Sequence, residues 1–393
     1  MDNANDRLRV LILPSWYPTE RYPVGGVFIQ EQARALARRT DVEVRVLFVD
    51  GVSIPAWLRG PKLLTLHREE GVPVYRLLMP SVPGVWPFLY AVWGVFAYMG
   101  VRMLKVKPTL LHAHVALPAG LSGALIKLLW RVPLVLTEHM GPFSQLMRNR
   151  PAAFATRFSM RRADRVVAVS SALRDQITSY PQLRRRIEVL PNVVNVGEFA
   201  VRTTTRQPGD PARLLFVGEM ITSIKGVDYL IGAVSILKKR GIEVTLDLVG
   251  DGRNRREYET LARRLRVADL CRFHGTLRHE EVVELMPQYD VLVVSSLAET
   301  FGVVVVEALA SGAPVVATRC GGPEGILTAD LGVLVQKANS EALADGIVDV
   351  LNRPDDFPPQ HLRRVAEERF GQASISSRLV GLYREVLGTG GQS

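Results

Sequence analysis

An alternation of short apolar runs with longer helix-like stretches constrains the fold of this chain most, and it starts twice. The first series predicts strands at residues 8–13, 42–48, 72–77, 109–112, 132–137, 165–168 and 187–190. The second predicts strands at 213–217, 243–249, 272–274, 291–294, 314–317 and 332–335. Helices are expected between them, among others at 27–39, 226–239 and 280–286. Such alternation predicts parallel sheets with helices on both faces.

The two series predict two domains, because 393 residues exceed what one hydrophobic core usually serves. Residues 203–211 are almost free of apolar side chains and are expected to form the linker. We expect an α/β protein with Rossmann-like, doubly wound domains at 1–200 and 201–371, and a helix at about 372–388 that packs back on the first. Ligands of open α/β sheets lie beyond the carboxyl ends of the strands, so a cleft between two facing sheets is the expected site.

Composition excludes several classes of protein. With 47% hydrophobic residues the chain is neither disordered nor fibrous. Cys271 and Cys320 are too few for a disulfide framework and are not in metal-ligand spacing. Residues 1–10 lack the apolar core of a secretory signal. The expected location is therefore a reducing cytoplasm.

The positive charge lies in the first half of the chain. Residues 1–200 hold 26 Lys and Arg against 14 Asp and Glu, whereas residues 201–393 hold 23 against 25. A basic surface attracts anionic membranes, acidic glycans or nucleic acids. No nucleic-acid module is recognisable, and the basic residues are not interleaved with aromatic ones as in single-strand binders. An anionic membrane surface therefore ranks first, and nucleic acid is not expected as a partner.

An uncharged segment from Leu77 to Val101 leaves three structures open. It is long enough to suggest a bilayer span, but prolines interrupt its first third and strand-like runs lie on both sides. A helix over about 84–103 that docks on its own domain is favoured. A helix that also dips into a membrane interface comes second, and a true span comes third.

Two carboxylates, Glu299 and Glu307, bracket the stretch Thr300-Phe301-Gly302-Val303 and the valines that follow. If Gly302 ends a turn and Val303 opens a helix, Glu299 lies at the mouth of the loop and Glu307 about two turns inside the helix. Carboxylates accept hydrogen bonds from vicinal hydroxyls, and helix amides bind phosphate, so the arrangement suits a sugar nucleotide. Two alternatives remain: a chance pair of acidic residues, and a strand built from the four valines.

Several ordered motifs resemble the retaining glycosyltransferases of family 4, which have the GT-B architecture. The resemblance covers nearly the whole chain. Its motifs are Pro191-Asn192-Val193-Val194-Asn195, Phe216-Val217-Gly218 with Lys225-Gly226, Val249-Gly250-Asp251-Gly252, Phe273-His274-Gly275, the Glu299–Glu307 block, and Pro314–Thr318 with Gly321-Gly322-Pro323-Glu324.

The resemblance assigns roles to residues of the second domain. Glu299 resembles the carboxylate that holds the donor sugar, and Glu307 the one that binds the ribose hydroxyls. Lys225 resembles the lysine that neutralises the leaving diphosphate, although a solvated lysine at a helix start is the simpler explanation without the family. The predicted donor-binding residues are Gly26, Gly218, Lys225, Gly252, Arg253, His274, Gly275, Glu299, Phe301, Gly302, Val303 and Glu307.

One departure from the family concerns Glu219. The family usually has an arginine directly after the glycine that corresponds to Gly218, and the loop to Lys225 is one residue longer here. A carboxylate beside a diphosphate is repulsive, so Glu219 is expected to point away. Arg253 is a candidate to supply the missing positive charge.

In the first domain, His139 follows a strand where the family has an active-site histidine, so the predicted catalytic residues are His139, Glu299 and Lys225. Gly25 and Gly26 precede a helix and suit either a phosphate or acceptor site or an ordinary turn. His112 and His114 also end a strand, where packing or orienting roles are favoured. The predicted acceptor-side residues are Ser15, Trp16, Tyr17, Gly25 and His114.

The resemblance implies transfer of a glycosyl group from a UDP- or GDP-sugar to an acceptor hydroxyl with the anomeric configuration retained. No cofactor, metal or enzymic nucleophile is expected, because positioning and charge stabilisation carry the catalysis. A hexosyltransferase that acts on a lipid-linked glycan for cell-surface polysaccharide, at the inner face of the plasma membrane, is favoured. Alternatives are glycosylation of a small-molecule natural product, a sugar-nucleotide epimerase or hydrolase, and a catalytically idle binding subunit.

Overall fold

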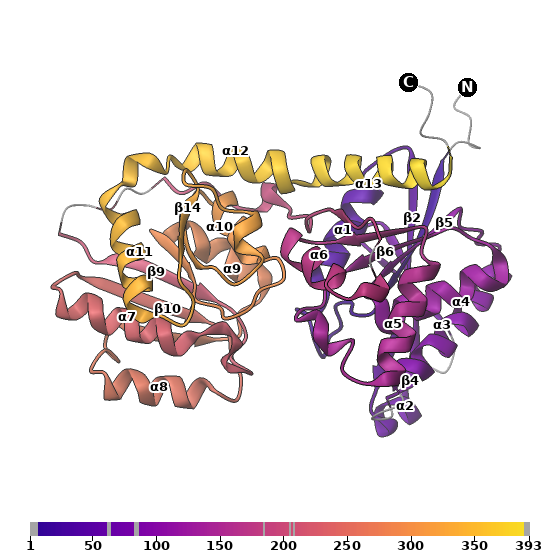
Figure 1. The fold of residues 1–393 in the computed structure, drawn as a ribbon, viewed down its shortest axis with the longest axis horizontal. Coiled ribbons are helices and arrows are strands. Elements are labelled where there is room, and N and C mark those ends of the chain that lie inside the picture. The colour runs from indigo at the N-terminus through magenta and orange to yellow at the C-terminus, as the bar shows by residue number, and fades with distance from the viewer. Residues whose placement is uncertain are drawn as a thin grey trace. The chain divides into compact units, whose positions relative to one another are not determined.

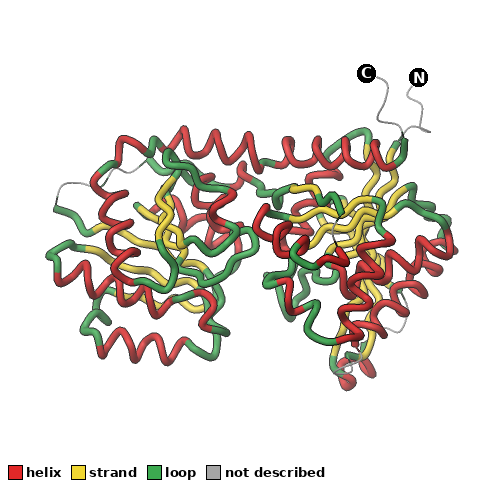
Figure 2. Tube along the Cα trace, in the orientation of Figure 1, coloured by secondary structure: helices red, strands yellow, loops and turns green. Residues whose placement is uncertain are grey.

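The computed structural model describes residues 7–60, 64–81, 86–183, 185–203, 206 and 209–388. The chain divides into two compact units, unit 1 (Met1–Val193 with Ile375–Ser393) and unit 2 (Val194–Ser374). Each unit is an α/β domain built on its own sheet, as the colours by chain position and by secondary structure show (Figure 1, Figure 2). The division falls at 193/194 and 374/375, a few residues from the expected bounds at 200/201 and 371/372. Part of the expected 203–211 linker lies outside the described residues.

Unit 1 has a sheet of eight described strands in the order β3-β4-β2-β1-β5-β6-β7-β8. The strands are β1 (Leu8–Pro14), β2 (Val42–Val52), β3 (Thr65–Glu69), β4 (Val72–Pro80), β5 (Leu110–His114), β6 (Leu134–Glu138), β7 (Arg165–Ala168) and β8 (Glu188–Val189). The strands expected from the sequence pair in parallel, and the additional edge strand β3 pairs antiparallel with β4. No strand was expected at β3, because it is short and its side chains are exposed or half-buried.

The helices of unit 1 cover both faces of this sheet. They are α1 (Val27–Ala37), α2 (Ile54–Arg59), α3 (Trp86–Met103), α4 (Leu121–Trp130), α5 (Arg150–Arg162), α6 (Ser171–Thr178) and α13 (Gln372–Val386). The last of them, α13, joins the core of the first unit: Ile375, Leu379 and Tyr383 are buried with Leu8, Val10 and other side chains of β1, β2 and α1. This burial ties the end of the chain to its beginning.

Helix α3 forms within the uncharged segment and packs against α4, β2 and β4. Tyr90, Ala97, Tyr98 and Val101 are buried on its inner side. A helix docked on its own domain is therefore present. No helix in the described residues has the length and apolar character required to cross a membrane.

Unit 2 has a parallel sheet of six described strands in the order β11-β10-β9-β12-β13-β14. They are β9 (Ala212–Val217), β10 (Val244–Val249), β11 (Cys271–Gly275), β12 (Val291–Val294), β13 (Val315–Thr318) and β14 (Gly332–Val335). The helices are α7 (Val227–Lys239), α8 (Arg255–Arg264), α9 (His279–Leu285), α10 (Val303–Ala310), α11 (Ser340–Asn352) and α12 (Pro359–Phe370). Each expected strand of this unit is present, with bounds that differ by one residue at most.

The four valines at 303–306 lie in helix α10, not in a strand. Gly302 adopts a left-handed conformation (φ 90°) that ends the preceding loop and opens the helix, as the turn hypothesis predicted. Val305 and Val306 are fully buried, so tertiary packing overrides the β preference of valine here.

Both sheets reverse their strand order next to their first strand. In unit 1 the reversal lies between β1 and β5, and in unit 2 between β9 and β12. Loops that leave neighbouring strands at such a point diverge to opposite faces and leave a crevice at the carboxyl edge, where ligands of this fold class bind. The residues that follow β1, β5, β9 and β12 are therefore the first candidates for a ligand site.

Candidate active site

Lys225 and Glu299 meet at the switch point of unit 2. Lys225 ends a single 3₁₀ turn (Ser223–Lys225) after β9, and Glu299 lies in the loop after β12. The Lys225 Nζ atom is 2.6 Å from Glu299 Oε2, and the two side chains are 27% and 17% exposed. The structure thus brings together two predicted catalytic residues that are 74 positions apart in the sequence.

Hydrogen bonds lock the two loops that carry this pair. The Ser295 hydroxyl donates to the Lys225 carbonyl at 2.8 Å, and the Leu297 amide donates to the Ile224 carbonyl at 2.7 Å. Gly226 has φ 59°, and a Cβ there would lie 2.1 Å from the Ser295 carbonyl oxygen. Glycine is therefore required for the close approach that holds Lys225 beside Glu299.

The loop from Glu299 to Gly302 is fixed on its other side by the loop after β13. The Glu299 amide donates to the Cys320 carbonyl at 3.0 Å, and Gly322 donates back to the Glu299 carbonyl at 2.8 Å. The buried Phe301 ring packs edge-to-face on Phe370 with centroids 5.9 Å apart. Phe301 therefore anchors the loop, and its predicted contact with a donor stays a prediction.

Glu307 is half-buried on the same face of α10 as Val303. It is the fifth residue of the helix, so it lies little more than one turn inside, not two as expected. The helix begins without a side-chain cap at Gly302 and has no acidic residue in its first turn. Its positive end is thus available to an anion between the two carboxylates.

Two other predicted donor residues, Gly218 and Gly252, shape the neighbouring loops. A Cβ on Gly218 would lie 3.6 Å from Cδ of Lys225, and one on Gly252 (φ 155°) would lie 2.3 Å from the Met220 carbonyl carbon. Glu219 is exposed, and its orientation away from a diphosphate stays a prediction. Arg253 donates from Nε to the Ile221 carbonyl at 2.7 Å, so this nitrogen braces the loop that follows Glu219.

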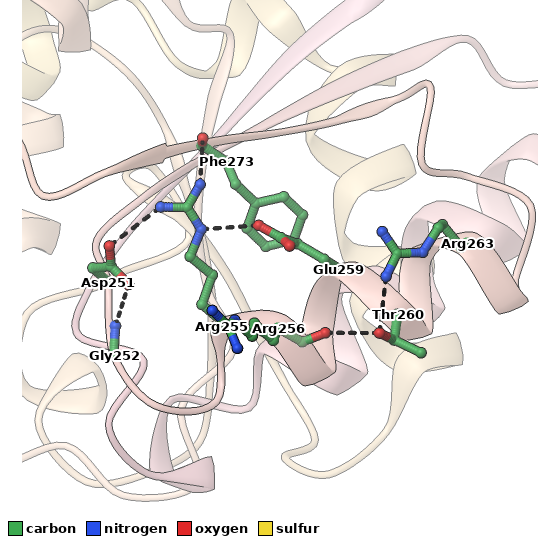
Figure 3. A network of polar contacts seen from close by, with 8 residues as sticks. All are labelled: Asp251, Gly252, Arg255, Arg256, Glu259, Thr260, Arg263 and Phe273. Carbon is green, nitrogen blue, oxygen red and sulfur yellow. Dashed lines mark hydrogen bonds and ion pairs between the residues drawn. The ribbon is translucent and has the colours of Figure 1, made fainter.

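Arg255 forms a network at the ends of β10 and β11 that sequence reasoning missed (Figure 3). Its guanidinium contacts Asp251 Oδ2 at 3.2 Å, Glu259 Oε1 at 2.9 Å and the Phe273 carbonyl at 3.2 Å. The side chains border a surface depression of about 500 Å³. The spacing of Asp251, Arg255 and Glu259 at i, i+4 and i+8 was the available signal.

Predicted donor residues His274 and Gly275 border the same network. His274 Nε2 is 2.5 Å from Oδ1 of Asp247, which is buried on β10. Gly275 has φ 78°, and a Cβ there would lie 3.2 Å from Arg255 Nη1. Glycine at this position therefore leaves room for the arginine as well as permitting the turn.

In unit 1, Gly25 and Gly26 close the loop between β1 and α1. A Cβ on Gly25 would lie 2.2 Å from the Tyr22 ring, and one on Gly26 (φ 76°) would lie 2.3 Å from the Trp16 carbonyl oxygen. Gly26 is the cap residue of α1, which has no acidic residue in its first turn. Both glycines are thus explained by packing, and the uncapped helix end is compatible with the predicted anion contact.

The other predicted acceptor-side residues differ in their surroundings. The buried Ser15 hydroxyl donates to the His114 carbonyl at 2.9 Å and accepts from the Ala119 amide at 3.1 Å. Tyr17 is in the core beside Phe48, and burial raises the pKa of its hydroxyl. Trp16 is half-buried. The structure joins Ser15 to His114, whereas the buried Tyr17 hydroxyl has no hydrogen-bond partner among the described residues.

Three histidines lie at or near the ends of β5 and β6: His114 is hydrogen-bonded to His139, and Gln32 links His114 to His112. His114 Nδ1 is 2.9 Å from His139 Nε2, and His112 Nδ1 is 2.7 Å from the Tyr383 hydroxyl of α13. Gln32 Nε2 of α1 is 3.2 Å from His112 Nδ1 and 3.4 Å from His114 Nε2. These bonds hold the His112 and His114 rings in place, and the orienting or acceptor-side roles predicted for them stay predictions.

Burial sets the protonation of these three histidines. It lowers the pKa of His112 and of His139 to about 3, and it holds the pKa of His114 well below its usual value. The nearby His112 also lowers the pKa of the other two, while Asn192 opposes part of the effect at His139. All three are therefore neutral at physiological pH.

His139 retains one unused polar atom. Its Nδ1 is buried without a hydrogen-bond partner among the described residues, whereas its ring packs on Phe28 of α1 at 4.6 Å between centroids. A buried ring nitrogen without a partner is costly, and a ligand that meets it recovers that cost. The Asn192 side chain also interacts with this ring and raises its pKa, so a contact of His139 with a donor or an acceptor stays a prediction.

Glu138, which sequence reasoning missed, holds the backbone beside His139. Its carboxylate accepts from the amides of Ala116 at 2.9 Å, His139 at 2.9 Å and Met140 at 2.8 Å. Burial raises its pKa to about 7, although the three amide donors favour the ionised form. A buried acid directly before the predicted histidine was the signal for its positioning role.

The described residues contain no group of three or more His, Cys, Asp or Glu side chains placed to hold a metal ion.

Comparisons with known proteins identify the class of protein to which this fold and candidate site belong, the glycosyltransferases. The model of Glycosyltransferase Family 4 matches residues 25–198, and that of Glycosyl transferases group 1 matches residues 211–353. The D-inositol 3-phosphate glycosyltransferase of Xylanimonas cellulosilytica is 30% identical over 92% of this chain and 91% of its own. The glycogen synthase of Mycobacterium tuberculosis is also 30% identical, over 69% of this chain and 67% of its own.

Solved structures show the same fold at lower identity. Sucrose-phosphate synthase from Thermosynechococcus elongatus has a TM-score of 0.79 at 20% identity, and covers 97% of this chain and 100% of its own. Anabaena HepE, solved with UDP and glucose, has a TM-score of 0.72 at 20% identity over 96% of this chain and 100% of its own. The architecture is therefore GT-B, and the chain belongs to glycosyltransferase family 4.

Proposed function

We propose that this enzyme is a retaining, metal-independent hexosyltransferase that uses a UDP- or GDP-sugar and transfers the sugar to an acceptor hydroxyl. The observation that carries the proposal is the Lys225–Glu299 ion pair at the switch point, next to the uncapped end of α10. The cation matches the diphosphate of such a donor, and the carboxylate, which only accepts hydrogen bonds, matches the hydroxyls of its sugar. Binding of UDP and UDP-glucose by HepE, a structural neighbour, supports a nucleotide sugar as the ligand.

Donor binding would separate the two charges. Lys225 turns to the diphosphate, together with the amides at the start of α10, and Glu299 accepts hydrogen bonds from the sugar hydroxyls. Glu307, one turn further along the helix, takes the ribose hydroxyls. Each group exchanges its present partner for the ligand, so the ion pair keeps both side chains in position before the donor arrives.

The transfer step needs no enzymic nucleophile. The bond between the anomeric carbon and the diphosphate oxygen breaks, and the acceptor oxygen forms its bond on the same face. The acceptor proton passes to the departing diphosphate. Lys225 and the helix amides stabilise the charge that develops on that leaving group, which is the main electrostatic task of the site.

The acceptor proposed first is a lipid-linked glycan of cell-surface polysaccharide, reached by a cytoplasmic enzyme at the inner face of the membrane. The basic first half of the chain and the apolar helix α3 favour it. A small polar acceptor is the second candidate. Relatives named as a D-inositol 3-phosphate glycosyltransferase and an N-acetyl-alpha-D-glucosaminyl L-malate synthase favour this alternative.

Thermal unfolding with a panel of UDP- and GDP-hexoses tests the proposal. A donor at about 100 times its Kd stabilises the folded protein by about 2.7 kcal/mol, which raises the Tm by roughly 5 to 10 °C. The shift should persist in EDTA. The stabilising donor is then incubated with lipid-linked and small polar acceptors, and the anomeric configuration of the product is determined by NMR.

Three outcomes would overturn parts of the proposal. Loss of the shift in EDTA contradicts metal independence. Inversion at the anomeric carbon contradicts retention. Release of free sugar or of an isomerised nucleotide sugar, with no transfer to any acceptor, favours a hydrolase or epimerase instead.

A further inference from the structure

A long stretch of unit 1 has cations but almost no acidic residues. Between Gly71 and Ala163 the sequence has one carboxylate, Glu138, which is fully buried. The Lys and Arg residues of the same stretch are Arg76, Arg102, Lys105, Lys107, Lys127, Arg131, Arg148, Arg150, Arg157, Arg161 and Arg162. The described surface of this stretch is therefore positive, and its own sequence offers no exposed carboxylate to balance it.

Helices α3, α4 and α5 come from this stretch; α3 packs against α4, and α4 packs against α5. Large apolar side chains on them and on the residue after α3 are exposed to solvent. They are Val92, Trp93, Phe96, Met103, Leu104, Leu128, Leu129 and Phe154. We call these three helices, with their exposed apolar and basic side chains, the α3–α5 face.

The exposed residues of α3 lie on one side of the helix. Phe96 follows Val92 by four positions, and Met103 follows Phe96 by seven, which is the spacing of a single helical stripe. Phe96 is 55% exposed, Leu129 of α4 61% and Phe154 of α5 68%. Such side chains on neighbouring helices indicate an interaction surface, whereas a single exposed apolar residue would not.

The cations around these side chains are available to a partner. Within the described residues no carboxylate lies within 4.0 Å of Arg102, Lys105 or Arg131. Lys127 contacts Asp164 at 2.5 Å, and Arg162 stacks on the Phe158 ring at 5.5 Å. The long side chains can keep their charge at a polar boundary while their aliphatic parts lie along the apolar surface.

We propose that the α3–α5 face docks on an anionic lipid bilayer, with its apolar side chains among the headgroups and its cations against the lipid phosphates. A second copy of the chain would bring like charges together, and nucleic acid would leave Leu128, Leu129 and Met103 exposed. An anionic bilayer satisfies both components, because apolar burial and attraction to acidic lipids add in interfacial binding. Trp93 suits the boundary between water and acyl chains.

This inference rests on the proposed function, because docking would bring the enzyme to its lipid-linked acceptor. Co-sedimentation of the full chain with vesicles tests it. The protein should bind vesicles of phosphatidylglycerol and phosphatidylcholine and bind pure phosphatidylcholine vesicles at least about tenfold more weakly. Raising the ionic strength from about 0.1 to about 1 M, which shortens the Debye length from about 10 to about 3 Å, should weaken binding without abolishing it.

Paired substitutions separate the two contributions. Lys105→Glu with Arg131→Glu should lower the partition coefficient at least about 25-fold, because each cation near the surface contributes about fivefold. Phe96→Ser with Leu129→Ser should lower it at least about tenfold. Lys239→Glu with Arg264→Glu in unit 2 and Leu58→Ser on α2 are matched controls and should bind as the unchanged protein does.

Three results would overturn the inference: equal binding to both vesicle types, equal losses in the face variants and the controls, or a dimer in solution that Phe96→Ser dissociates. The donor-induced rise in Tm, measured without vesicles, shows that each variant is folded. Failure to dock therefore leaves the proposed transferase activity intact, and a missing donor shift leaves the docking result intact.

Discussion

The two units place their candidate residues at the same point of the same kind of sheet but in opposite electrostatic conditions. In unit 1, His112, His114 and His139 are buried and neutral, with His139 bonded to His114 and Gln32 linking His114 to His112. In unit 2, Lys225 and Glu299 are charged and partly open to solvent after β9 and β12. One switch point holds a preorganised neutral cluster, and the other holds ions that can change partners.

This difference indicates a division of labour. Charges that are already paired and partly solvated can be transferred to a ligand at little cost. Buried neutral groups cannot change charge without a large desolvation penalty, so they hold positions and offer directed hydrogen bonds. Unit 2 is therefore expected to control donor affinity and turnover, and unit 1 to control geometry.

The largest effect is expected from Glu299→Ala. Turnover should fall by about three orders of magnitude or more, because the sugar loses a charge-assisted contact that the transition state needs. The Tm should change little, since partly exposed ion pairs contribute about 1 kcal/mol or less. Initial rates and thermal unfolding measure both.

A matched variant sharpens this prediction. The turnover of Lys225→Ala should fall by about two orders of magnitude. The loss of turnover in the double variant should be much smaller than the product of the two single losses, because the two residues act as a unit. Turnover of Glu299→Ala at the unchanged rate would contradict the assignment of the site and remove the contrast between the units.

The sequence predicted the strands of unit 2 closely, because turn glycines bound its short apolar runs. It also predicted the helix start at Gly302, from a glycine between a loop and an apolar run. It did not predict β3, since an exposed edge strand leaves no apolar signature.

Candidate site residues could be predicted where they lie next to a strand end. They were harder to predict where long-range packing determines which residues meet. Lys225 and Glu299 could be named, but their ion pair depends on the β9–β12 pairing. Glu138, Arg255 and Tyr383 were missed because their contacts are with partners that only the fold brings close. Glu138 bonds to Ala116, Tyr383 bonds to His112, and Arg255 bonds to the Phe273 carbonyl of β11. Sequence periodicity does not encode such contacts.

The pH dependence of unfolding should distinguish the neutral cluster from the charged site. The pKa of each cluster histidine is lowered in the folded state, so the unfolded state binds more protons and stability falls as pH drops below about 6.5. Glu138, with its pKa raised to about 7, acts in the opposite direction between about pH 4.5 and 7. The net effect is a loss of about 2 kcal/mol per pH unit near pH 5.5.

Urea unfolding followed by tryptophan fluorescence measures this slope for unit 1 alone, because Trp16, Trp57, Trp86, Trp93 and Trp130 all belong to it. His112→Gln should reduce the slope by about 1 kcal/mol per pH unit, whatever it does to the stability itself. His361→Gln in unit 2 should leave the slope unchanged. A flat profile between pH 7 and 5 would mean that the cluster is not buried and neutral.

Glu307→Ala should weaken donor binding by roughly tenfold and leave kcat nearly unchanged, because the ribose hydroxyls are distant from the reacting carbon. A 2′-deoxynucleotide donor should lose a similar factor with the unchanged enzyme. The 2′-deoxynucleotide donor should bind Glu307→Ala no more weakly than the ordinary donor does, since the same hydrogen bond is already absent. Additive losses would show that Glu307 does not contact the ribose.

The smallest effect is expected from Glu219→Arg, which places a positive charge where family members usually have one. Glu219 is exposed, so the gain in donor affinity should be roughly two- to fivefold at low salt and should shrink as salt is added. Glu219→Gln separates removal of the negative charge from addition of a positive one and should give a smaller gain. A gain would show that one surface residue of unit 2 can change donor affinity. The buried histidines of unit 1 offer no such exposed position. An affinity that is indifferent to both substitutions would show that Arg253 or another cation already supplies the missing charge.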